Sequence, residues 1–65
     1  MIYKTGDTVY EIKNKSIITH IIKEWKFVTW IQALLIDEKW RDSRDFYETL
    51  EDAEHHLKAE RGFRP

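Results

Sequence analysis

The histidines are the residues best suited to metal chemistry in this 65-residue chain. His55 and His56 are adjacent, and Glu60 follows His56 by about one turn if the segment is helical. The third histidine, His20, would have to approach them in space. A metal site needs about three converging ligands, and thiolate ligands are excluded because the chain has no cysteine. We therefore expect no metal site and solvated histidines.

Nucleophilic and acid–base side chains are present, but the neighbours that would activate them are missing. Ser16 and Ser43 have no adjacent general base. The only glycines, Gly6 and Gly62, cannot form a phosphate-binding loop. The carboxylates fall in expected turns and helix caps, where their ordinary role is structural. We expect no enzymatic activity, no catalytic residue and no cofactor.

The charge balance argues against a general nucleic-acid binder. The formal net charge is −1, whereas phosphate recognition usually needs a basic excess. Residues 1–26 nevertheless carry five lysines against three acids. Nucleic-acid binding therefore stays open as an alternative function. The residues of this alternative site are Lys13, Lys15, Lys23 and Lys26, with Tyr10 and Trp25 as stacking side chains.

Aromatic residues are abundant, at 14% of the chain. A core this small has room for only a few large side chains, and six aliphatic residues and one of the aromatics, Phe46, already compete for it. These residues are Ile12, Ile18, Ile22, Leu34, Ile36, Phe46 and Leu57. The surplus either fills the seam between sheet and helix or forms an interface, where tryptophan is a usual anchor. The predicted interaction residues are Trp25, Val28, Trp30 and Trp40.

The first third of the chain has the pattern of a β-hairpin. Thr8, Tyr10 and Ile12 alternate, and residues 16–23 are rich in isoleucine. Between them, Asn14 tolerates the left-handed backbone of a tight turn. The second strand carries apolar residues on both faces, so we expect it to be covered on two sides.

Residues 27–36 are apolar enough for a strand or a helix. High β-propensity over residues 27–31 and the absence of an N-cap favour one strand, followed by a turn at Asp37 and Glu38 and a short strand. The alternative is a helix over residues 28–40, because apolar residues also recur at steps of three and four.

The end of the chain predicts a helix over about residues 50–61. Thr49 can cap its first turn. Leu50, Ala53 and Leu57 form one apolar stripe, which must dock on the sheet because so short a helix is marginal alone.

Two stretches resemble small SH3-like β-barrel domains of bacteria and their phages. They are G-D-T-V-Y-E-I-K-N-K-S-I at residues 6–17 and L-L-I-D-E-K-W-R-D-S-R-D-F-Y-E-T-L-E-D-A-E-H-H-L at residues 34–57. The match omits residues 23–33 and carries no catalytic residue. It implies a mainly β fold: a small SH3-like antiparallel barrel or bent sheet with one C-terminal α-helix. It also implies a binding role, as an accessory protein of a phage or mobile element.

We expect a single domain over residues 1–65, with its strands within residues 7–42. A chain this short buries only about 60% of its unfolded surface. With no disulfide, self-association is the remaining way to stabilise it. The simplest dimer would pair Val28, Trp30 or Trp40 with their symmetry mates. No signal-like or membrane-spanning apolar segment is present, so we expect a cytoplasmic protein with no membrane contact.

Overall fold

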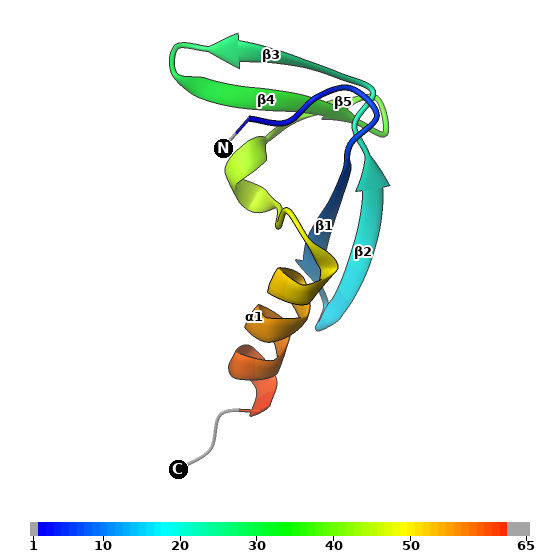
Figure 1. The fold of residues 1–65 in the computed structure, drawn as a ribbon, viewed down its shortest axis with the longest axis vertical. Coiled ribbons are helices and arrows are strands. Elements are labelled where there is room, and N and C mark those ends of the chain that lie inside the picture. Colours follow the sequence, from blue (N-terminus) through cyan, green and yellow to red (C-terminus); the bar gives the residue numbers. More distant parts are fainter. Residues whose placement is uncertain (1, 63–65) are drawn as a thin grey trace.

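The computed structural model of the protein describes residues 2–62, and the side chains of residues 2–59. The fold is mainly β, with two antiparallel sheets and one C-terminal helix (Figure 1). The elements are β1 (Thr8–Lys13), β2 (Ser16–Ile21), β3 (Glu24–Val28), β4 (Ile31–Ile36), β5 (Lys39–Asp42), the 3-10 helix η1 (Ser43–Asp45) and α1 (Leu50–Gly62). The molecule is elongated, 41 × 21 × 17 Å, with the sheet of β3, β4 and β5 at one end and α1 at the other (Figure 1).

One bent run of chain is shared by both sheets. β2 pairs with β1, and β3 pairs with β4, while the chain bends between them at Ile22 and Lys23. Ile22 donates its N–H to the carbonyl of Asp7 at 2.9 Å, which continues the hydrogen bonding of the β1–β2 sheet by one residue. Lys23 donates to the carbonyl of Leu35 at 3.0 Å, in the second. The bend therefore sets the angle between the two sheets.

The chain returns from the second sheet to the first at Tyr47. Tyr47 and Tyr10 of β1 exchange backbone hydrogen bonds of 2.8 and 3.0 Å. This contact is an isolated bridge, and the described residues contain no closed barrel. Of the two predicted forms, the closed barrel is not found, and the sheets are bent and open.

Two of the turns confirm the predictions made from their residues. Asn14 and Lys15 join β1 to β2 with φ of 53° and 62°. Asp37 and Glu38 join β4 to β5 with φ of 52° and 64°. Positive φ at both central residues is the type I′ pattern, whose twist suits a two-residue hairpin.

The prediction of one strand over residues 27–36 is wrong. Thr29, with φ of 57°, and Trp30 form a third two-residue turn, so the block folds into the β3–β4 hairpin. The alternative helix over residues 28–40 is wrong as well. The local propensity of residues 27–31 favours extended backbone. A turn inside the block nevertheless lets its two halves pair with each other as β3 and β4, which a single strand over residues 27–36 could not do.

The core lies where the two sheets meet. Its buried residues are Tyr3, Val9, Ile22, Leu34, Ile36 and Phe46. Of the other predicted core residues, Ile12 and Leu57 are half-buried and Ile18 is exposed. Ile21 is also exposed, so the prediction that the second strand is covered on two sides is wrong. In the described residues α1 is the one α-helix that lies against β1 and β2, and a single helix covers only one side of a sheet.

Helix α1 begins where Thr49 predicts. The Thr49 hydroxyl accepts the N–H of Asp52 at 3.0 Å, which confirms the cap. The helix lies against β1 and β2, with Ala53 fully buried. Leu50 is exposed and Leu57 half-buried, so the docked stripe is narrower than predicted.

Candidate interaction site

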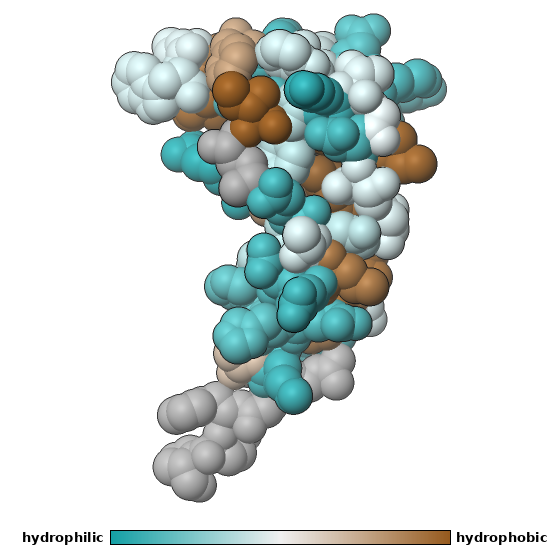
Figure 2. All heavy atoms as spheres, viewed as in Figure 1, coloured by the Kyte–Doolittle hydropathy of each residue, from teal (hydrophilic) through white to brown (hydrophobic). Residues whose placement is uncertain are grey.

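The β3–β4 hairpin carries a concentration of exposed apolar side chains. Every residue of β3 is exposed. Trp30, at the turn, is 85% exposed, and Val28 and Phe27 are 52% and 50% exposed. Figure 2 shows brown and pale spheres at this end of the molecule, with some teal ones among them, whereas the visible side of α1 is mostly teal. Exposed apolar surface gathered in one place marks a contact surface more often than scattered residues do.

The strand pairing divides the four predicted interaction residues between two sides of the sheet. Val28 and Trp40 share the outer side with the half-buried residues of β4. Trp25 is on the core side, opposite the fully buried Leu34. Trp30 lies at the turn between the two sides. All four are exposed, but they do not form one flat patch.

Two ring contacts hold these side chains in place. The ammonium nitrogen of Lys26 lies 4.3 Å from the centre of the Trp40 ring. Because Trp40 is on β5, the lysine side chain crosses β4 and leans away from the free edge of β3. On the core side, the rings of Trp25 and Phe27 meet edge to face, with centroids 5.7 Å apart. The surface is therefore partly ordered before any partner binds.

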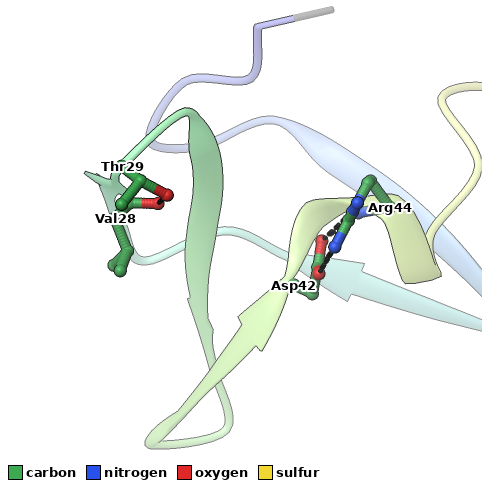
Figure 3. Close-up of polar contacts among 4 residues, drawn as sticks. All are labelled: Val28, Thr29, Asp42 and Arg44. Carbon is green, nitrogen blue, oxygen red and sulfur yellow. Dashed lines mark hydrogen bonds and ion pairs between the residues drawn. The ribbon is translucent and has the colours of Figure 1, made fainter.

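The turn beneath Trp30 is strained. A β-branched residue such as Thr29 rarely adopts positive φ. Trp30 has no positive φ, so the turn has the type II′ pattern, in which glycine is usual at the first position. The Thr29 hydroxyl donates to the carbonyl of Val28 (Figure 3). The strained residue is thus directly beside the most exposed tryptophan.

The chain segment after β5 is fastened by a cap that was not predicted. The Asp42 carboxylate accepts the backbone N–H of Arg44 at 2.8 Å and pairs with its guanidinium at 2.7 Å (Figure 3). These bonds hold the pKa of Asp42 below its usual value. Residues 43–45 therefore form the short helix η1, which leads to the buried Phe46.

A polar cluster between the sheets was also missed by sequence reasoning. Glu11 accepts a hydrogen bond from the Arg41 guanidinium at 2.7 Å and contacts His20 Nε2 at 2.9 Å. On the other side of the ring, His20 Nδ1 lies 3.7 Å from an Asp37 carboxylate oxygen. The Arg41 hydrogen bond, helped by the one from His20, holds the pKa of Glu11 below its usual value against the effect of burial.

We call these four residues, Glu11, His20, Asp37 and Arg41, the clasp, because they link β1, β2 and β5. His20 Nε2 contacts the Glu11 carboxylate at 2.9 Å, while Nδ1 faces the exposed Asp37 carboxylate and the ring packs edge-on against Phe46. The signal that could have found it is the turn at Asn14. That turn sets the hairpin register, which places Glu11 and His20 on one face.

The residues considered for metal binding do not converge. His55 and His56 are exposed on α1, and the His56 ring contacts Tyr47 with centroids 4.8 Å apart. His20 belongs to the clasp, and the Glu60 side chain lies outside the described side chains. Within residues 2–59, no group of three or more His, Asp and Glu side chains is placed to hold a metal ion.

The lysines of the nucleic-acid alternative do not gather into one strip. Lys13 and Lys15 lie at the β1–β2 turn, Lys23 at the bend, and Lys26 on β3. They are spread along the bent β2–β3 run. Tyr10 is half-buried, so it offers little ring surface to a base.

No helix in the described part of the chain is long and apolar enough to cross a membrane.

Comparisons with models of known protein families, with curated proteins and with solved structures give no significant match. The function is therefore inferred from the residues and their arrangement.

Proposed function

We propose that this protein is a non-catalytic interaction module that binds another protein through its hairpin surface. We define this surface as Trp30 at the turn, Val28 and Trp40 on the outer side, and Trp25 on the reverse. The observation that carries the proposal is Trp30, 85% exposed beside a strained turn. Exposed tryptophans are frequent interface anchors, and retained backbone strain is concentrated at functional sites.

The surface also indicates the chemistry of its partner. The indole of Trp30 needs an apolar pocket, as anchor side chains generally do. Lys26, exposed beside Trp40, supplies a positive charge at the same surface. The partner we propose therefore presents an apolar pocket with an acidic group at its rim.

Site-specific photo-crosslinking tests this function. A photoreactive phenylalanine at position 30 should capture one defined protein from the native host, and free wild-type chain should compete for it. Free Trp30→Ala should compete poorly. The control position is Leu50, an apolar residue 45% exposed at the start of α1. Equal capture at both positions, or competition by Trp30→Ala as strong as by wild type, would contradict the proposal.

We further propose that the fold is an open form of the SH3-like group. Two features support this assignment: the bent β2–β3 run shared by two sheets, and the return of Tyr47 to Tyr10 after η1. An experimental structure tests it. Residues 46–48 should pair along β1, and a segment that leaves β1 without contact would remove the assignment.

Single-stranded nucleic acid is the second candidate partner. The exposed Lys26–Trp40 pair joins a cation to an aromatic ring, the combination that such surfaces use. Binding should then weaken steeply with salt. In a low-salt fluorescence titration with oligonucleotides, Lys26→Ala should weaken binding, and Lys13→Ala, at the distant turn, should have a smaller effect. No binding by the wild-type chain would remove this candidate.

A further inference from the structure

Strand β3 forms a free edge of the second sheet. The strand order is β3-β4-β5, and along residues 2–62 no strand pairs with the other side of β3. Such an edge presents unpaired N–H and C=O groups and is a template for another strand. Edges are commonly blocked by proline or by an outward lysine. β3 has no proline, and Lys26 leans over Trp40, away from this edge.

We propose that two copies of the chain pair antiparallel along β3, which joins their second sheets into one continuous sheet. This goes beyond the proposed function, because its partner is a second copy of the chain and its contact is the free backbone edge of β3. It shares Trp25 and Lys26 with the hairpin surface, but it does not use Trp30.

The occupant is a second copy because β3 is self-complementary. Residues 24–28 read E-W-K-F-V, with an aromatic residue on each side of Lys26. A two-fold axis at Lys26 sets Trp25 opposite Phe27 of the second copy, and Phe27 opposite its Trp25. Aromatic pairs directly across two strands stabilise a sheet. Pairing would also bring four aromatic rings together on the core side, where Trp25 and Phe27 already touch.

The same axis gives the best register. It pairs all five residues of β3, whereas an axis at Trp25 or Phe27 leaves two of the five unpaired. The two Lys26 side chains meet at the axis, and like charges directly opposite disfavour pairing. The Trp40 ring, 4.3 Å from the ammonium, draws this charge away from the axis. Glu24 of each copy also lies diagonal to Lys26 of the other, within reach of long side chains.

Single-cysteine variants test the register, since the chain has no cysteine of its own. Directly opposed residues of antiparallel strands have Cα atoms about 4.5–5.5 Å apart, within the range that a disulfide spans. Lys26→Cys should therefore form a linked dimer on mild oxidation, faster than the exposed control Lys13→Cys by roughly tenfold or more. A maximum at Trp25→Cys or Phe27→Cys, or a rate at position 26 no higher than at position 13, would overturn the proposed pairing.

Sedimentation equilibrium of the wild-type chain supplies the second measurement. It should show a reversible monomer–dimer equilibrium. Phe27→Lys should raise the dissociation constant by roughly tenfold or more, because it removes both aromatic pairs and adds charge beside Lys26. The control is Leu50→Lys, which also replaces an exposed apolar side chain by lysine, but on α1. It should leave the dissociation constant unchanged.

The two proposals fail separately. A chain that stays monomeric at every concentration overturns the β3 pairing, even if position 30 captures a foreign protein. A dimer linked through position 26, with no capture at position 30, supports the pairing and removes the proposed function.

Discussion

Gln32 shows how a single buried amide can fasten one segment to another. The side chain is only 4% exposed and lies on the core side of β4. Its carbonyl oxygen accepts the backbone N–H of Tyr3 at 2.9 Å, and its amide nitrogen donates to the Tyr3 carbonyl at 2.8 Å. The side-chain amide thus gives the N–H and C=O of Tyr3 the two hydrogen bonds that the backbone of a neighbouring strand would give in a sheet. Burial, with smaller contributions from nearby carboxylates, raises the pKa of the Tyr3 hydroxyl.

Gln32→Leu should destabilise the protein by about 2–6 kcal/mol. The reason is that two buried backbone groups of Tyr3 lose their partners, at roughly 1–3 kcal/mol each. Urea unfolding followed by tryptophan fluorescence measures the change. Thr19→Val, at an exposed position of β2, is the control and should stay within about 0.5 kcal/mol of wild type. A loss below about 1 kcal/mol for Gln32→Leu would show that water satisfies Tyr3 instead.

Glu11 gives the stability of the fold a dependence on pH. Its pKa is lower in the folded state than in the unfolded chain, mainly because of the Arg41 hydrogen bond. The charged carboxylate therefore stabilises the fold above the ordinary glutamate pKa of about 4.3, and this contribution is lost as the pH falls through the lower folded value.

Glu11→Gln should consequently destabilise the protein at pH 7 by about 1.5–3 kcal/mol, the range for hydrogen bonds to charged groups. The gap to wild type should narrow at pH 3, where the wild-type carboxylate is increasingly protonated. Denaturant unfolding at the two pH values measures this difference. Glu54→Gln, exposed on α1, should show no comparable change. A gap that is equal at both pH values would argue against the Glu11–Arg41 pair.

Among the elements, those with a local chemical signal were predictable. Asn14 marks a turn because it tolerates left-handed backbone, and Thr49 marks a helix start because its hydroxyl accepts an N–H. Thr29 gives no such signal, since its intrinsic preference is for extended backbone and only tertiary pairing overrides it. The Glu11–Arg41 bond joins residues 30 apart in the chain, so it depends on how the sheets meet. An aromatic surplus was visible in the composition, but the side each ring occupies was not.

The strained β3–β4 turn should respond to glycine. Thr29→Gly removes the Cβ that opposes a φ of 57°, and should stabilise the protein by about 1 kcal/mol. For a domain of this size that raises the melting temperature by roughly 4–8 °C. Asn14→Gly, at a turn whose residue already tolerates positive φ, should change it much less. If the strained turn positions Trp30, capture at position 30 should weaken in Thr29→Gly despite the higher stability. A lower melting temperature for Thr29→Gly would contradict the strain.

For the molecule as a whole, burial is uneven along its length. The core sits where the sheets meet, around Ile22, Leu34 and Ile36. Away from this junction, β3 has no buried residue. Segments with few buried contacts open locally at lower free energy than the core does. The surface proposed to bind partners is therefore also the part of the sheet that the core holds least firmly.

Amide hydrogen exchange can test this gradient and the β3 pairing together. In dilute solution, Leu34 and Ile36 should exchange slowest, and the amides of β3 much faster. Backbone groups of β3 point alternately toward β4 and toward the free edge, and the edge-directed amides lack a partner in the monomer. Raising the concentration should protect those amides selectively, while Leu34 gains only the general stabilisation that mass action gives. Phe27→Lys should abolish the selective gain and keep the slow exchange at Leu34. Protection that rises uniformly, with no excess at the free edge of β3, would place any association on another surface.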